Sequence, residues 1–147
     1  MNDPIQAFNI RVYALIIEQE NILTSKELIK GEIITKFPGG GVEFGEGILA
    51  ALQREAQEEI GQELEIINHF YTTDFFQRSS FKSSDQLVSI YYTAKLSSSL
   101  KNKVTQPIKD QPVFIWKKLE DLVSDNLHFP IDKKVLEIVK KQIAPTA

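Results

Sequence analysis

The chain has 147 residues, of which 42% are hydrophobic and 25% are charged, with a net charge of −3. This balance predicts one soluble globular domain over residues 1–147. The chain has no cysteine, which excludes cysteine chemistry. The negative net charge argues against a nucleic-acid polymer as partner, because binding such a polymer needs a basic face. No apolar segment approaches the ~20 residues of a membrane span and the start of the chain lacks the pattern of a signal peptide, so we expect a cytoplasmic protein without a membrane partner.

The first third of the chain predicts three strands, at residues 8–18, 21–27 and 33–37. The first strand contains an unbroken apolar run from Val12 to Ile17, which is typical of a strand buried on both faces. The third strand ends at Pro38 and a run of three glycines, which we interpret as a loop.

Residues 47–60 predict a helix, because they contain no proline and are rich in Ala, Leu, Gln and Glu. Gly61 follows where a helix stop belongs. The apolar stripe that would pack this helix on the sheet consists of Leu49, Leu52, Ala56 and Ile60.

The second half of the chain predicts three more strands, at residues 64–76, 87–96 and 113–116. The polar stretch 97–112 is longer than most connections in a compact domain, which favours a functional loop. A helical turn is expected at 119–123, and Pro130 suits the first position of a helix that continues over 131–143. The predicted fold class is therefore α/β (α+β), with a mixed sheet between helices.

Three acids on the predicted helix carry the functional argument. Glu55, Glu58 and Glu59 stand at positions i, i+3 and i+4, so their carboxylates share one helix face. Such a trio can be a solvated helix face. It is also the donor set that hard divalent cations prefer, because they bind several negatively charged oxygens.

The wider spacing of this segment decides between the two readings. Gly40 is followed after five residues by Glu46, and after seven more by Arg54-Glu55, Glu58-Glu59 and Gly61. Seven such matches arise by chance on the order of 10⁻⁹ per register at ordinary residue frequencies. This spacing is that of the Nudix box, and on these residues the chain resembles the Nudix hydrolases, and among them the MutT-like members. One departure is Gln62, where the family pattern normally has an aliphatic residue.

The resemblance implies an enzyme that hydrolyses a phosphoanhydride bond, with water attacking a phosphorus of a nucleoside diphosphate linked to another group. It implies Mg²⁺ as cofactor, with Mn²⁺ as a substitute. Glu55, Glu58 and Glu59 would be metal ligands, with the carbonyl of Gly40 as a further one. Arg54 would orient these carboxylates, and Glu46 would brace the loop against Arg54.

The resemblance also implies two further site residues. The general base of the family varies, being a box glutamate or an acid in the loop before the last strand, where this chain has Asp110. An exposed loop acid is the alternative interpretation of Asp110. Lys26, near the end of the second strand, is a candidate for binding the substrate phosphates, although it would equally suit a solvated strand edge.

The substrate is left open by the sequence. A nucleoside triphosphate or damaged nucleotide is expected first. ADP-ribose, a nucleotide sugar or a dinucleoside polyphosphate is the alternative substrate class, and a Nudix-fold module that senses a nucleotide without cleaving it is the alternative function. The small-molecule nucleotide is the expected partner, and a homodimer is left open.

Overall fold

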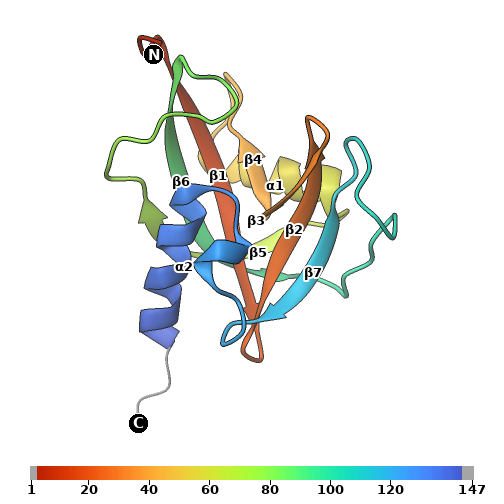
Figure 1. Ribbon diagram of the computed structural model, residues 1–147. Coiled ribbons are helices and arrows are strands. Elements are labelled where there is room, and N and C mark those ends of the chain that lie inside the picture. Colours follow the sequence, from red (N-terminus) through yellow and green to blue (C-terminus); the bar gives the residue numbers. More distant parts are fainter. Residues whose placement is uncertain (1–2, 144–147) are drawn as a thin grey trace.

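Two long strands, β1 (Ala7–Glu18) and β2 (Asn21–Ile29), organise the computed structural model, which describes residues 3–143 (Figure 1). The strands are joined by a tight turn in which Gln19 and Glu20 have φ of 47° and 70°, the left-handed conformation that matches the twist of a hairpin. They pair only beside this turn, through Ile17 with Ile22 and Glu18 with Asn21. Beyond it they diverge and take different partners.

The remaining strands fill the sheet on both sides of this hairpin. They are β3 (Glu32–Lys36), β4 (Gly39–Gly41), β5 (Leu64–Thr72), β6 (Asp85–Leu96) and β7 (Val113–Lys118). The strand order is β3-β2-β1-β6-β5, with β4 paired to β1 and β7 paired to β2. Strands β1 and β6 run parallel and the other pairs are antiparallel, so the sheet is mixed as the sequence predicted.

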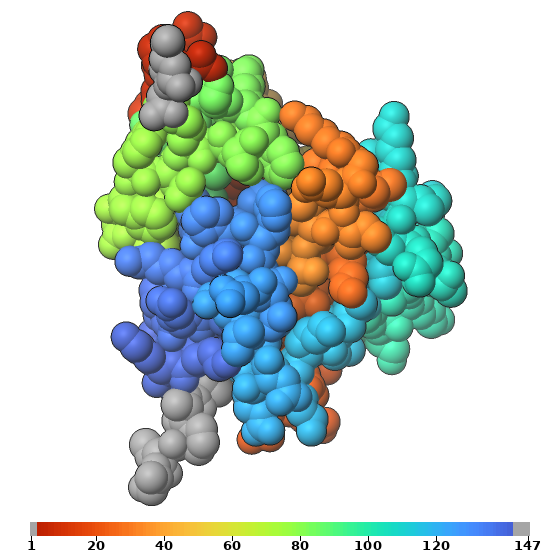
Figure 2. Space-filling model, in the orientation of Figure 1, coloured from red at the N-terminus to blue at the C-terminus, as the bar shows by residue number. Residues whose placement is uncertain are grey.

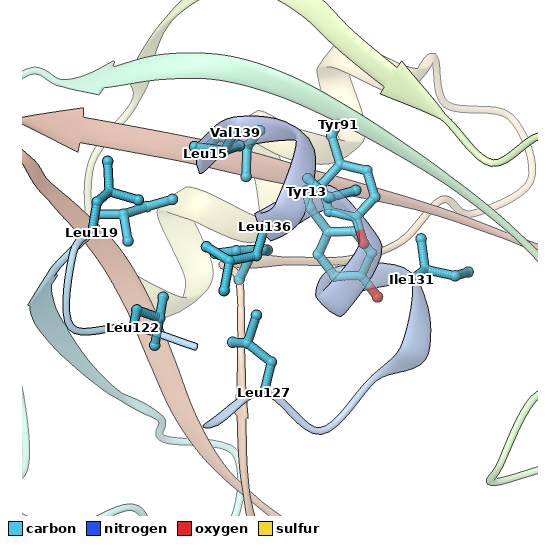
Figure 3. Packing of buried hydrophobic residues seen from close by; sticks show 12 residues of the cluster. Tyr13, Leu15, Tyr91, Leu119, Leu122, Leu127, Ile131, Leu136 and Val139 are labelled. Atoms are coloured by element: carbon cyan, nitrogen blue, oxygen red, sulfur yellow. The ribbon is translucent and has the colours of Figure 1, made fainter. Parts of the chain in front are cut away.

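One helix covers each side of β1: α1 (Ile48–Glu59) lies behind the sheet in Figure 1 and α2 (Pro130–Ile143) lies in front of it. Alternate residues of β1 enter two apolar cores. Tyr13 and Leu15 pack with α2 and with Tyr91 of β6 (Figure 3), whereas Val12 and Ala14 pack with α1. The predicted burial of β1 on both faces is confirmed.

Three expectations about local structure were wrong. The glycine run after Pro38 is the short strand β4, because it has a partner in β1 that the sequence does not reveal. The expected helical turn at 119–123 is a plain turn, and a 3₁₀ helix follows at Ser124–Asn126. On α1, Leu49 is 45% exposed and Ala51 is buried in its place, since the helix lies close against β4 and β1 and the smaller side chain fits that contact.

The long loop 97–112 is tied to the sheet by a side chain. Asn102 donates from Nδ2 to the carbonyl of Phe114 (2.9 Å) and accepts through Oδ1 from the Phe114 N–H (2.7 Å). This amide takes the place of a strand partner at Phe114, on the edge of β7 that does not pair with β2. Among residues 3–143 there is no helix of sufficient length and apolar character to span a membrane.

Candidate active site

The three predicted acids of α1 lie on one face at the C-terminal half of the helix. Glu55 and Glu59 are half-buried, whereas Glu58 is exposed. The last turn of α1 contains no basic residue, although a helix C-terminus favours cations and disfavours carboxylates. The acids therefore cost some helix stability, which is typical of residues held for function.

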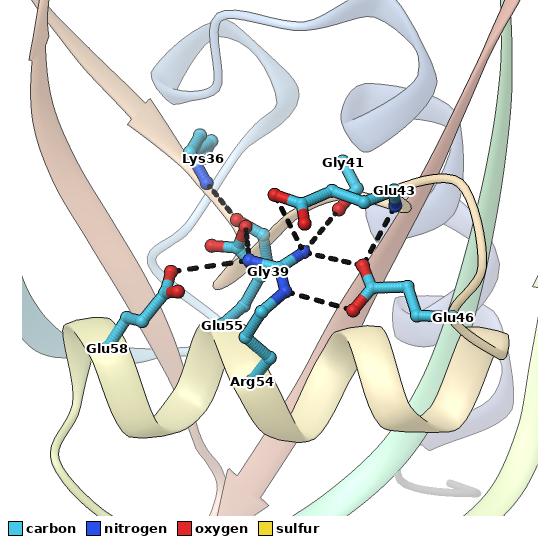
Figure 4. Close-up of polar contacts among 8 residues, drawn as sticks. All are labelled: Lys36, Gly39, Gly41, Glu43, Glu46, Arg54, Glu55 and Glu58. Atoms are coloured by element: carbon cyan, nitrogen blue, oxygen red, sulfur yellow. Dashed lines mark hydrogen bonds and ion pairs between the residues drawn. The ribbon is translucent and has the colours of Figure 1, made fainter.

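Arg54 organises this face, as Figure 4 shows. Its Nε and Nη2 bind the two carboxylate oxygens of Glu46, at 3.0 and 2.7 Å, in a bidentate ion pair. Its Nη1 donates to Glu55 at 3.1 Å and to Glu58 at 3.3 Å, and its Nη2 also donates to the Gly41 carbonyl at 2.9 Å. Arg54 thus contacts two of the carboxylates expected to bind metal and ties the loop between β4 and α1 to the helix, and its orienting role stays a prediction.

The ion pair between Arg54 and Glu46 shifts the pKa of both groups. The hydrogen bond from Arg54, aided by the Glu43 N–H, lowers the pKa of Glu46 to about 2. The hydrogen bond to Glu46 raises the pKa of Arg54. The loop between β4 and α1 is therefore pinned to the helix over the whole neutral and mildly acidic range.

Strand β4 brings the glycine run directly against the acids. A Cβ atom on Gly40 would be 2.5 Å from the carboxyl carbon of Glu55, and one on Gly39 would be 2.1 Å from the carbonyl oxygen of Val12. Only glycine fits either position at this separation. The structure therefore brings together Gly40 and the carboxylate of Glu55, two of the residues expected to bind metal.

A buried lysine that the sequence analysis did not single out lies behind this site. Lys36 of β3 is 1% exposed, and its ammonium group donates to the carbonyls of Phe37 (3.1 Å) and Gly39 (3.2 Å). It lies 5.4 Å from the centre of the Tyr13 ring, a cation–π contact. In the sequence, the only signal was a lysine at the end of a short predicted strand, just before Phe-Pro-Gly-Gly.

Among the acids of α1, Glu59 has the most strongly shifted pKa. Burial raises the pKa of its carboxyl group to about 7; Lys36 opposes this shift, and the negative charges of Glu27, Glu55 and Glu58 add to it. Glu27 belongs to β2 and was also missed by sequence reasoning. The charges of Glu27, Glu55 and Glu58 each repel the charge of Glu59, and Lys36 offsets part of this repulsion.

This excess of carboxylates fits a divalent cation, which binds hard oxygen donors. Glu55, Glu58 and Glu59 supply them, and the Gly40 carbonyl is next to Glu55. In the arrangement described for residues 3–143, no three acid or histidine side chains converge to form a complete metal site. Arg54 instead holds Glu55 and Glu58, so binding a cation requires these two side chains to exchange part of their contact with Arg54.

A cavity of about 120 Å³ lies next to Glu27 and Lys36. It opens where the loop at residues 79–81, strand β2 and the start of α2 meet, and Figure 2 shows a hollow at this junction. Its walls include two cations, Arg11 and Lys36, and aromatic rings. Glu27 lines it as well, and the charge of Glu27 acts on Glu59, so Glu27 connects the cavity with the carboxylate face.

A buried carboxylate, that of Asp132, is part of the cavity lining. Asp132 of α2 is fully buried and accepts hydrogen bonds from the Tyr91 hydroxyl and the Phe37 N–H. Burial raises the pKa of Asp132 to about 6, although its contacts with Tyr91 and Lys36 oppose the shift. Arg11 donates from Nε to the Tyr13 hydroxyl at 2.6 Å and completes this layer.

The other two predicted site residues lie apart from the carboxylate face. Asp110 is exposed at a tight turn with φ of 62°, closed by a bridge between Ile108 and Gln111. In the described part of the chain no hydrogen bond or ion pair connects it to α1. Lys26 pairs with Val113 of β7, so it is near the end of the same loop, and strand alternation directs it away from the face of Glu27. Their proposed roles stay predictions.

Gln62, the departure from the family pattern, closes the turn after α1 with polar contacts. Its Oε1 accepts from the N–H groups of Ser97 and Ser98 at 2.7 and 3.0 Å, and its Nε2 donates to the Ser98 carbonyl at 3.1 Å. A polar side chain is accommodated there because it ties the turn to the end of β6, away from the carboxylates.

Comparison with known proteins identifies the family of this domain. The NUDIX domain family model matches residues 7–138. Nucleoside triphosphatase NudI of Escherichia coli O17:K52:H18 (strain UMN026 / ExPEC) is 33% identical over 95 residues, covering 61% of this chain and 65% of that protein. The matched region thus spans just under two thirds of that relative.

Solved structures share the fold over nearly the whole chain. A NUDIX hydrolase from Nitrosomonas europaea superposes with a TM-score of 0.73 at 18% identity, covering 92% of this chain and 90% of that one. A MutT NUDIX hydrolase from Burkholderia pseudomallei gives a TM-score of 0.70 at 24% identity, covering 90% and 97%. At these identities the similarity concerns the fold.

Proposed function

The chain belongs to the NUDIX domain family, and from this premise we propose that it is an enzyme that hydrolyses a phosphoanhydride bond in a nucleoside triphosphate, with Mg²⁺ as cofactor and Mn²⁺ as a substitute. The observation that carries the proposal is that Glu27 links two features: a face of carboxylates on α1 and a cavity with cationic and aromatic walls. The carboxylate face suits a metal-bound phosphate chain, and the cavity suits a nucleobase.

We propose a nucleoside triphosphate as substrate, rather than another linked nucleoside diphosphate, because of the name of one relative. The protein that is 33% identical over 95 residues is named a nucleoside triphosphatase. The alternative substrates, ADP-ribose, nucleotide sugars and dinucleoside polyphosphates, belong in the same test.

The residues of this chain have separate tasks in the proposed reaction. Glu55, Glu58 and Glu59, with the Gly40 carbonyl, hold the cation. When bound, the cation neutralises the phosphate oxygens and makes water a stronger nucleophile. Arg54 keeps Glu55 and Glu58 in place and is itself fixed by Glu46. The proton of the attacking water goes to a carboxylate, either a box glutamate or Asp110.

Arg11 and Lys36 lie where the cavity meets the acids, and both influence the acids electrostatically. Their positive charges balance part of the carboxylate charge at the point where an anionic substrate would enter. Bare phosphate would still be repelled by four carboxylates. Substrate binding should therefore require the cation.

The test is a product screen with the purified protein and Mg²⁺ over nucleoside triphosphates, ADP-ribose, nucleotide sugars and dinucleoside polyphosphates. We expect turnover of triphosphates to a nucleoside monophosphate and pyrophosphate, and none in EDTA. Release of orthophosphate without pyrophosphate would contradict the proposed site of attack. Nucleotide binding that needs no metal, without turnover of any substrate, would instead identify a sensing module.

A further inference from the structure

Ser25 of β2 has a buried hydroxyl group without a partner. The side chain is 0% exposed, and within residues 3–143 its Oγ is a buried side-chain atom that makes no hydrogen bond. Thr24, the preceding residue, is equally buried, but its hydroxyl donates to the carbonyl of Ile115 at 2.9 Å. Buried hydroxyl groups are nearly always hydrogen-bonded, because an unpaired one lowers stability. The unpaired Ser25 hydroxyl therefore indicates an acceptor that reaches it in another state of the protein.

The Ser25 side chain faces the helix α1. Side chains alternate along a strand, so Leu23, Ser25 and Glu27 share one face of β2. Leu23 packs in the core that contains Leu52 of α1. Phe114 of β7 is paired with Ser25 and belongs to the same core. Because paired residues of antiparallel strands lie on the same face, both neighbours put the Ser25 hydroxyl on the α1 side of the sheet.

The charges that act on Glu59 put its carboxylate near Ser25. Two charged side chains of the sheet, Lys36 and Glu27, influence the charge of Glu59. Lys36 of β3 is paired directly with Ser25, and Glu27 is two residues further along the same face of β2. Ser25 is therefore adjacent to both of these sheet residues. Glu59 is half-buried, as expected for a helix side chain that points toward the sheet.

Glu59 is also the helix acid that Arg54 does not hold. Figure 4 shows the contacts of Arg54 with Glu55 and Glu58, and among residues 3–143 no ion pair connects Arg54 with Glu59. A carboxylate that binds a cation through one oxygen can accept a hydrogen bond through the other. Contacts of this second kind orient metal-binding carboxylates in proteins. In the described part of the chain Glu59 thus lacks a donor, and Ser25 lacks an acceptor.

We propose that Ser25 is a positioning residue of the active site, whose hydroxyl donates to the Glu59 carboxylate once that carboxylate turns toward a bound cation. The inference rests on the proposed function, in which Glu59 helps to hold the cation. Ser25 then supports the third acid of the helix, as Arg54 supports the other two. Because the hydrogen bond forms only in the metal-bound state, it strengthens metal binding without stabilising the metal-free protein.

The variant Ser25→Ala tests this assignment without any substrate. In EDTA the variant loses no hydrogen bond, so its melting temperature should equal or exceed that of the wild type. In calorimetry it should bind Mg²⁺ or Mn²⁺ about tenfold or more weakly, as is typical when a group that supports a metal ligand is lost. An equal Kd for the metal in both proteins would overturn the inference. A lower melting temperature in EDTA would also overturn it, because it would reveal a partner in the metal-free protein.

Two further variants separate the hydrogen bond from the volume of the side chain. Ser25→Cys nearly keeps the size but has only a weak S–H donor, so its metal binding should match that of Ser25→Ala. Ser25→Thr keeps the hydroxyl and suits a strand, so it should recover most of the metal affinity. Metal binding of wild-type strength in Ser25→Cys would show that filling the space is sufficient, and would contradict the role of the hydroxyl.

Thr24→Val is the matched control, because Thr24 has a buried hydroxyl on the opposite face of the same strand with its partner in place. It should show the reverse pattern, with a lower melting temperature in EDTA and an unchanged Kd for Mg²⁺. If Thr24→Val weakened metal binding as much as Ser25→Ala, any change in β2 would disturb the site and the specific role of Ser25 would be refuted.

Substrate turnover separates this inference from the proposed function. In Ser25→Ala the Mg²⁺ concentration for half-maximal activity should rise by the same factor as the Kd for Mg²⁺. Weaker metal binding in Ser25→Ala, without turnover of any nucleotide by the wild type, would support the role of Ser25 and contradict the hydrolase function. Turnover by the wild type, with an unchanged Mg²⁺ dependence and Kd in Ser25→Ala, would support the hydrolase function and contradict the role of Ser25.

Discussion

Gly40 lies so close to Glu55 that a Cβ atom at position 40 would be 2.5 Å from the carboxyl carbon of Glu55. The atoms that would have to move belong to the end of a flexible side chain. At the neighbouring Gly39 they are backbone atoms of β1, and Gly39 also has φ of 147°. Two adjacent glycines are thus required for different reasons, one for the site and one for the fold.

This difference predicts opposite effects of two alanine substitutions. Gly40→Ala should lower kcat by at least about tenfold, because Glu55 must leave its place, while the free energy of unfolding falls by only about 1 kcal/mol. Gly39→Ala should destabilise the protein by more than about 3 kcal/mol, since a rigid backbone clash adds to an unfavourable φ. Activity assays and urea titrations measure both. Gly47→Ala is the control, because a Cβ there meets no atom within 4 Å; equal loss of activity in Gly40→Ala and Gly47→Ala would refute the explanation.

The ion pair between Arg54 and Glu46 takes up part of the positive charge that Arg54 would otherwise direct to Glu55 and Glu58. In Glu46→Gln this charge is shared mainly with Glu55 and Glu58, so Arg54 should compete better with the metal. We expect the Mg²⁺ concentration for half-maximal activity to rise by several-fold. Glu43→Gln, whose side chain is 72% exposed and 4.0 Å from Arg54, should behave as wild type. An unchanged Mg²⁺ dependence in Glu46→Gln would show that Glu46 has no such effect.

The carboxylates of α1 should account for metal binding. We expect Mg²⁺ or Mn²⁺ to bind to the wild type and to raise its melting temperature, because a ligand of the folded state stabilises it by about 2.7 kcal/mol at 100 times its Kd. Glu58→Gln/Glu59→Gln should abolish both effects in calorimetry and thermal unfolding. Glu63→Gln/Glu65→Gln removes the same charge from exposed positions of the next segment and should retain them. Metal titrations that are the same in the two double variants would exclude this site.

Asp110 is tested as the proton acceptor by Asp110→Asn. Asparagine tolerates the positive φ of 62°, so the turn should persist and only the charge is lost. If Asp110 is the base, kcat falls by the ~10²–10⁴ of lost general-base catalysis with little change in KM. Asp125→Asn, at another exposed position, controls for charge. A kcat within threefold of wild type would assign the base to the box glutamates.

Asp132 predicts a specific pH dependence of stability. Its pKa is raised from 3.8 to about 6 in the folded protein, so between these values the folded state binds the proton more tightly than the unfolded state. The contribution of Asp132 to the free energy of unfolding therefore decreases as pH rises from about 4 to about 6, by on the order of 2–3 kcal/mol. Glu46, with its lowered pKa of about 2, acts in the opposite direction between about 2 and 4.5.

The two contributions separate in a difference experiment. Asp132→Asn removes the titration, so the difference in unfolding free energy between wild type and variant should change across pH 4 to 6 and be flat above it. Chemical denaturation at a series of pH values measures this, with Asp125→Asn as the control. A flat difference over the whole range would mean that Asp132 is not perturbed in the folded state.

Elements with local signals could be predicted from the amino-acid sequence. The apolar run of β1 predicted a strand buried on both faces, and the carboxylate spacing on α1 follows from helix geometry alone. Pro130 begins α2 as expected, and Gly61 has the positive φ of a helix stop. The family pattern is likewise a matter of spacing along the chain, so it could be found without a structure.

The tertiary structure alone decided which distant residues complete the site. Glu27, Lys36 and Asp132 come from β2, β3 and α2, and no spacing in the sequence connects them. They meet because β1 and β2 diverge after one hairpin and α2 closes over the gap between the sheet and the loop at 79–81. The glycine strand β4 depends in the same way on its partner β1. Pairing and burial between segments far apart in the chain arise from packing, and packing leaves no periodic signal in either segment.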